Sequence, residues 1–147
     1  MPDADTRMFF ELFNEIGILS QLSTAVFEAR LPEGMLVSHF SVVNHLTRVR
    51  DGQTPLALAQ AFQVPKTTMT HTLAGLAKAG YVEMRPNPED GRSKQIWLTD
   101  RGRAFREDAI AALGPDIAAL ARQYPVEHVG DILPRLAELR RVMDAMR

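Results

Sequence analysis

Residues 54–98 constrain the fold most, because two short helical segments are followed at once by two β-prone segments. Thr54 and Pro55 are a typical N-cap and first helical residue, and the helix that they begin ends after about two turns. A second helix is expected over 65–79, because Gly80 is a residue that commonly ends helices. Two helices of this size joined by a short turn predict a helix-turn-helix.

The two β-prone segments alternate between apolar and polar residues. In YVEMRP, Val82 and Met84 share one face, and in KQIWL, Ile96 and Leu98 do the same. The intervening NPEDGRS is rich in turn-forming residues. A β-hairpin directly behind a helix-turn-helix is a winged helix, so the fold is expected to be mainly α with a small β-hairpin wing. Thr99 is expected to cap the helix that follows.

The helix expected over 65–79 has two different faces. At about 100° per residue, Met69, Leu73 and Leu76 fall on one stripe that should face the core. Threonines lower helix propensity, but they can hydrogen-bond base edges or phosphates. Alternatively, Thr67 and Thr68 only help to cap the helix. The opposite face carries Thr67, Thr70, His71, Ala74 and Lys78.

Charge is distributed unevenly along the chain. Residues 65–106 contain eight Lys/Arg against four Asp/Glu, whereas the formal net charge of the whole chain is -1. A basic centre between acidic ends suggests a surface for a polyanion, although a chance fluctuation of a mixed-charge surface is the alternative.

The absence of cysteine excludes disulfides, thiolate zinc sites and thiol-based redox sensing.

The stretch TPLALAQAFQVPKTTMTHTLAGLAKAGYVEMRPNPEDGRSKQIWLTDRGRAF resembles the DNA-binding half of the MarR (multiple antibiotic resistance) family of transcriptional regulators. The matching features are the Leu-Ala of the first helix, then VPKTTMTHTLAGLAKAGYV, DGRSK and LTDRG, in this order and at these separations. The resemblance implies a bacterial regulator, a repressor, that binds double-stranded DNA sequence-specifically. A winged helix used only for protein–protein contact remains the alternative.

The resemblance also assigns roles to the wing. Asp90 and Arg92 are expected to act together, with Arg92 entering the minor groove, whose negative potential attracts arginine. Gly91 is expected to permit a backbone turn closed to other residues, and Lys94 suits a phosphate. The alternative is an ordinary hairpin with a surface ion pair worth about 0–1 kcal/mol. The expected DNA-binding residues are Lys66, Thr67, Thr68, Thr70, His71, Asp90, Arg92 and Lys94.

Two residues depart from the family pattern of the recognition helix. His71 and Gly75 stand where longer basic or polar residues are usual. Histidine cannot make the bidentate guanine contact of arginine, and a glycine weakens a helix by about 1 kcal/mol relative to alanine. DNA affinity is therefore expected to depend more on the wing and on phosphate contacts.

The two ends of the chain indicate a dimer. The last helix has an apolar seam with spacings of 4, 3, 4 and 3, and the N-terminal helix has a broad aromatic face. The resemblance implies that these helices interlock in a two-fold dimer, which predicts a pseudo-palindromic operator; packing of both ends on the core is the alternative. The expected interface residues are Phe9, Phe13, Ile132, Leu136, Leu139, Met143 and Met146.

The expected organisation is a single domain over residues 1–147. Its winged helix-turn-helix part spans 36–100, and its dimerisation helices span 6–30 and 100–147. Gly114-Pro115 and Pro134 should kink or break their helices. The last helix is expected to begin near Pro125.

Similar proteins are often released from DNA by small aromatic or phenolic anions bound between the dimerisation helices and the winged part. The candidate residues for such a site are Arg30, His39, Phe40 and Arg48.

No cofactor is expected, and no metal, because His39 and His45 do not share a helix face. An enzyme is excluded by the lack of a phosphate loop and of a nucleophile–base pair. The N-terminus is not a signal peptide and no membrane span is found, so a cytoplasmic location is expected.

Overall fold

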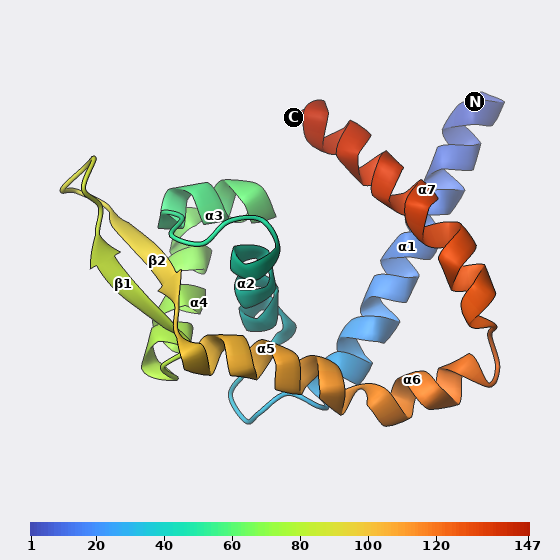
Figure 1. The fold of residues 1–147 in the computed structure, drawn as a ribbon. Helices are drawn as coiled ribbons and strands as arrows, with labels where there is room; N and C mark the ends of the chain where they lie inside the picture. Colours follow the sequence, from blue (N-terminus) through green and yellow to red (C-terminus); the bar gives the residue numbers. More distant parts are fainter. The chain divides into compact units, whose positions relative to one another are not determined.

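The computed structural model describes all 147 residues and contains seven helices and one two-stranded antiparallel sheet (Figure 1). Contacts divide the chain into two compact units, residues 1–112 and 113–147. No helix combines the length and apolar character that crossing a membrane requires. The elements are α1 (Ala4–Glu28), α2 (Val37–Arg48), α3 (Pro55–Phe62), α4 (Lys66–Lys78), β1 (Val82–Pro86), β2 (Lys94–Leu98), α5 (Asp100–Ala112), α6 (Gly114–Ala121) and α7 (Val126–Ala145).

The core of the first unit is built by α2, α3, α4, the hairpin and α5. Each of these elements contributes its apolar face to one cluster of buried side chains, so the winged helix predicted from the sequence is confirmed. The cluster consists of Val42, Val43, Leu46, Leu58, Ala59, Met69, Leu73, Leu76, Val82, Ile96, Leu98 and Phe105.

The ends of α3 and α4 follow from local chemistry. The hydroxyl of Thr54 accepts a hydrogen bond from the Ala57 amide at 3.1 Å, and proline occupies the first turn of α3, as predicted. Gln63 ends α3 in the left-handed region, with φ of +53°. Pro65 is the N-cap of α4 and not its first helical residue. Gly80 has φ of +80°, a conformation that glycine adopts without a Cβ penalty.

The hairpin is held to the rest of the unit by residues 51–53. Ile96 exchanges backbone hydrogen bonds with this segment, donating to Gln53 at 2.8 Å and accepting from Gly52 at 3.0 Å. The carboxylate of Asp51 accepts hydrogen bonds from the amides of Gly52 and Leu98. Nothing in the local sequence of residues 51–53 indicates this bridge to the wing, so it was not predicted.

Within the hairpin, Val82 pairs with Leu98 and Met84 pairs with Ile96. The predicted faces are therefore correct. Val82 and the two β2 residues are buried, whereas Met84 is 45% exposed although its cross-strand partner Ile96 is buried.

Thr99 connects the start of α5 to the end of α4. Its hydroxyl accepts from the Gly102 amide at 3.0 Å and donates to the Gly80 carbonyl at 2.6 Å. Its own amide donates to the Tyr81 carbonyl at 3.2 Å. Thr99 thus caps α5, as predicted, and also fixes the segment that leads from α4 into the wing.

The apolar faces at the two chain ends are exposed. None of α1, α6 and α7 contains a buried residue. Phe9 is 51% exposed and Phe13 45%, so these α1 side chains do not pack on the core of the first unit. The alternative in which the chain ends cover the core is therefore wrong for the aromatic face of α1, and it stays a prediction for α7.

The prolines of the C-terminal unit act differently from one another. The helix breaks between Ala112 and Gly114 beside Pro115, as predicted, and α7 begins directly after Pro125. Pro134, however, does not break α7, which continues from Val126 to Ala145. A proline removes one helical hydrogen bond, and the bonds on both sides keep this helix continuous.

Candidate DNA-binding surface

The outward face of α4 is exposed as predicted. Met69, Leu73 and Leu76 are at most 3% exposed. Pro65 is the N-cap, and no side chain caps the helix start; capping therefore does not explain the threonines. Thr72 is also buried, with its hydroxyl donating to the Thr68 carbonyl at 3.2 Å, which helical spacing alone had not indicated. The exposed residues are Lys66, Thr67, Thr68, Thr70, His71, Ala74 and Lys78.

Asp90 organises the tip of the wing. One of its carboxylate oxygens accepts hydrogen bonds from the Arg92 amide at 3.0 Å and from Arg92 Nε at 3.2 Å. The side chain of Arg92 is 93% exposed. The carboxylate therefore sets the direction of a guanidinium that otherwise extends into solvent. The ion pair itself adds little stability, because both groups are well solvated.

Gly91 does not have the role predicted for it. Its φ is not positive, and a Cβ built on it would meet no atom within 4 Å. The turn depends on side chains instead. Asn87 Nδ2 donates to the Ser93 hydroxyl at 2.9 Å, and the Ser93 amide donates to the Asp90 carbonyl at 3.1 Å. The turn-forming character of asparagine was visible in the sequence, but its partner across the loop was not.

The base of the wing carries a stacked pair of side chains. The guanidinium of Arg85 lies 4.9 Å from the centre of the Trp97 ring, and Glu83 forms an ion pair with Arg85. Lys94, exposed at the start of β2, pairs in register with Pro86 at the end of β1. The wing thus presents Lys94 and Arg92 on the same end of the hairpin.

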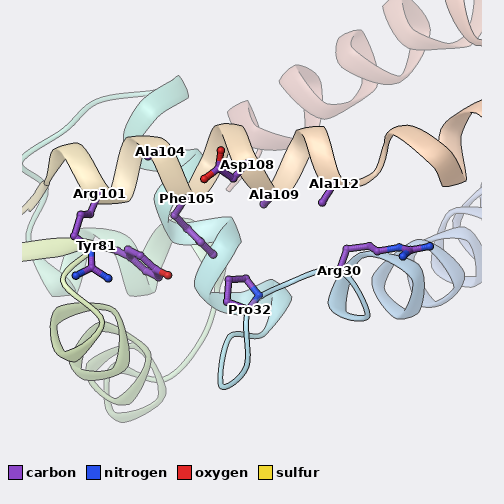
Figure 2. Close-up of a pocket in the computed structure, with 9 residues that line it drawn as sticks. All are labelled: Arg30, Pro32, Tyr81, Arg101, Ala104, Phe105, Asp108, Ala109 and Ala112. Atoms are coloured by element: carbon purple, nitrogen blue, oxygen red, sulfur yellow. The ribbon is translucent and has the colours of Figure 1, made fainter.

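The four residues proposed for effector binding are not gathered at one place. Arg30 lines a pocket of about 450 Å³ (Figure 2). Phe40 packs instead against Phe27 and Phe105, at ring distances of 4.5 and 6.2 Å. His39 lies against α4, and Arg48 is exposed in the last turn of α2.

The pocket has an aromatic wall and charged groups around it. The rings of Tyr81 and Phe105 stack at 4.3 Å, and the Arg101 guanidinium lies 5.9 Å from the Tyr81 ring. Figure 2 shows Arg101 and Tyr81 at one end of the pocket and Arg30 at the other. The full lining is Arg30, Pro32, Tyr81, Arg101, Ala104, Phe105, Asp108, Ala109 and Ala112. Apart from Arg30, these residues were not predicted, because they come together only when α5 packs behind the end of α4.

No group of three or more histidine, cysteine, aspartate or glutamate side chains in the structure could hold a metal ion.

Comparison with known proteins agrees with this geometry. A sequence model of the MarR family matches residues 33–93, which span α2 to the wing tip. The HTH-type transcriptional repressor YetL of Bacillus subtilis is 29% identical over 139 residues, covering 89% of this chain and 81% of YetL. Wild-type MarR from E. coli has the same fold, with a TM-score of 0.74 and 25% identity over 87% of this chain and 96% of that one. Residues 33–93 match the MarR family. The chain is a winged-helix transcriptional regulator and not an enzyme.

Two further relatives bear on the activity of MarR proteins. The transcriptional activatory protein BadR of Rhodopseudomonas palustris is 26% identical over 144 residues, covering 96% of this chain and 79% of BadR. A mutant of E. coli MarR has been solved in complex with operator DNA. Its TM-score is 0.70, at 24% identity over 94% of this chain and 99% of that one.

Gly75, one of the two residues that depart from the MarR pattern, contacts a side chain of another helix. Gly75 faces the imidazole of His39, which comes from the first turn of α2. His39 Nδ1 accepts a hydrogen bond from the Leu36 amide at 2.9 Å. Burial lowers the pKa of His39, and the nearby His71 lowers it further. This histidine is therefore neutral near pH 7, which leaves Nδ1 able to accept.

Proposed function

We propose that this MarR-family regulator is a repressor that binds a pseudo-palindromic operator as a homodimer. The observation that carries the proposal is the combination of α4 with the wing tip. The outward face of α4 is exposed and rich in hydroxyls, and beside it Asp90 directs an Arg92 side chain that is 93% exposed. The operator complex of E. coli MarR and the naming of YetL as a repressor support it.

The two parts of the surface have different tasks in this proposal. Thr70 and His71 on α4 contact base edges in the major groove. Arg92 enters the adjacent minor groove, where a narrow, A·T-rich sequence has the most negative potential. Lys66, Thr67, Thr68 and Lys94 contact phosphates and set the position of the protein on the duplex.

The exposed apolar faces of the terminal helices support the homodimer. Phe9 and Phe13 in α1 are about half exposed. Ile132 and Met143 in α7 are 42% and 48% exposed, and Met146 at its C-cap is 81% exposed. Exposed apolar surface of this extent marks an interaction site in a globular protein. A second copy of the chain offers the same apolar helices, and a two-fold pair of α4 helices would match half-sites about one DNA turn apart.

The pocket at Tyr81 suits an aromatic effector. A flat ring can stack on the wall of Tyr81 and Phe105, an anionic substituent can pair with Arg101 or Arg30, and the Asp108 carboxylate can accept from a phenolic hydroxyl. Because Tyr81 directly follows the recognition helix, a ligand that displaces its ring would disturb α4. Hydroxybenzoates should therefore release the DNA, whereas cyclohexanecarboxylate, which cannot stack, should release it poorly.

The decisive experiment is selection of the full-length protein on random duplexes at about 100–150 mM salt, because salt governs non-specific affinity. An enriched pseudo-palindrome with half-sites one turn apart is the expected result. Arg92→Ala should then bind that operator more weakly, mainly where its flanks are A·T-rich. Weak binding without enrichment would refute operator recognition and favour the winged helix as a protein-contact module.

A further inference from the structure

The recognition helix contains a glycine in its second half, where alanine would form a more stable helix. Gly75 lies one turn after His71, which belongs to the proposed DNA-contacting face. A Cβ added at Gly75 would lie 2.9 Å from Nε2 and 3.5 Å from Cδ2 of His39. The imidazole of His39 thus occupies the space that a side chain at position 75 would need.

His39 is held firmly on the α2 side. Its Nδ1 accepts the Leu36 amide hydrogen at 2.9 Å, which satisfies one of the donors left unpaired at the start of α2. Residues four and seven positions later on the same helix face, Val43 and Leu46, are 0% and 1% exposed. The ring therefore cannot turn away from α4 without losing this hydrogen bond.

The two helices also share apolar contacts. Val42, Val43 and Leu46 from α2 lie in the same cluster as Met69, Leu73 and Leu76 from α4. Apolar burial itself has no directional preference, and in this cluster the shapes of the close-packed side chains orient α4. A planar, hydrogen-bonded ring seated on a glycine adds a directional contact that opposes small rotations of α4 about its own axis.

We propose that His39 is a positioning residue for DNA recognition: seated on Gly75, it sets the rotation of α4 and so the approach of Thr70 and His71 to the base edges. The proposal rests on the DNA binding proposed above. It also explains why this chain keeps a glycine within its recognition helix. The competing explanation is that His39 only caps α2.

The test compares operator selectivity, measured as the Kd for a random duplex divided by the Kd for the selected operator. Gly75→Ala should lower this ratio about tenfold, comparable with the cost of one mismatched base pair, while the melting temperature changes little, because the higher helix propensity of alanine opposes the cost of displacing the ring. The matched control is Gly130→Ala, at a helical glycine of α7 whose added Cβ meets nothing within 4 Å and which lies on the side of the helix opposite the seam of Ile132 and Leu139. The control should leave the ratio unchanged.

Two variants of His39 separate positioning from capping. In the His39→Ala background, Gly75→Ala should cost no further selectivity, because the ring with which the methyl group collides is absent. His39→Gln keeps a side chain that can reach back to the Leu36 amide from the third helical position, but it removes the ring. Its selectivity should fall as in Gly75→Ala.

Three results would overturn the positioning role: wild-type selectivity in Gly75→Ala, wild-type selectivity in His39→Gln, or an equal loss from Gly75→Ala with and without His39. A wild-type protein that enriches no operator would instead refute the proposed function itself, before any variant is compared.

Discussion

Gly102 offers the sharpest test of how the winged unit is assembled. It is buried in the first turn of α5, and a Cβ at this position would collide with the carbonyl oxygen of Tyr81 and lie 3.0 Å from the carbonyl carbon. The same carbonyl accepts the Thr99 amide at 3.2 Å. Backbone atoms cannot swing aside as a side-chain end can, so Gly102→Ala must push α5 away from the segment between α4 and β1.

The size of the effect follows from two costs and one opposing gain in stability. Overpacking of a closely packed site costs about 1–3 kcal/mol, and weakening of the Thr99 hydrogen bond adds about 1 kcal/mol. Alanine in a helix offsets about 1 kcal/mol relative to glycine. A net loss of about 2 kcal/mol lowers the melting temperature of a chain of this length by roughly 4–8 °C.

The assay is thermal unfolding followed by circular dichroism at pH 7.5, with Gly130→Ala as the control. The control substitution meets no neighbouring atom and should keep or raise the melting temperature. If Gly102→Ala melts at or above the temperature of the control, the close approach of α5 to Tyr81 is not a constraint, and the reasoning is refuted.

Three further predictions concern the wing, the segment that holds it and two half-buried histidines. Lys94→Ala should weaken binding to all duplexes and lower the slope of log K against log salt by about one ion; an unchanged slope would argue against a phosphate contact. Asp51→Ala should reduce the free energy of unfolding in urea by about 1–3 kcal/mol, because the Leu98 amide loses its acceptor; an unchanged midpoint would show that water replaces it. Burial lowers the pKa of both His39 and His45 in the folded protein; the unfolded chain therefore binds more protons below about pH 6.5, and stability should fall as the pH drops through that value. In thermal melts between pH 7.5 and 5.5, replacing both histidines by glutamine should flatten this dependence.

Periodicity was sufficient to predict the elements whose signals are local. The stripe of Met69, Leu73 and Leu76 is buried as expected, and Thr54 and Thr99 cap the helices assigned to them. These features depend on residues close together in the chain, where spacing and capping chemistry determine structure directly.

Contacts between distant residues could not be predicted in the same way. His39 and Gly75 meet only because α2 packs on α4, and no pattern in either helix indicates the other. The pairing of Asn87 with Ser93 could not be distinguished in advance from a glycine-driven turn, so Gly91 was given a role that side-chain hydrogen bonds perform. The four residues predicted for effector binding do not line one pocket, because their positions also depend on contacts between distant parts of the chain.

The stacked side chains at the base of the wing have a practical consequence. Trp97 is the only tryptophan of the chain, and its ring lies over Gly52 and beside the Arg85 guanidinium. Its indole fluorescence therefore reports on the wing base alone, within the unit of residues 1–112. Far-ultraviolet circular dichroism sums the helices of both units. Recording the two signals through one denaturant titration thus gives, without any label, separate unfolding curves for the winged unit and for the molecule as a whole.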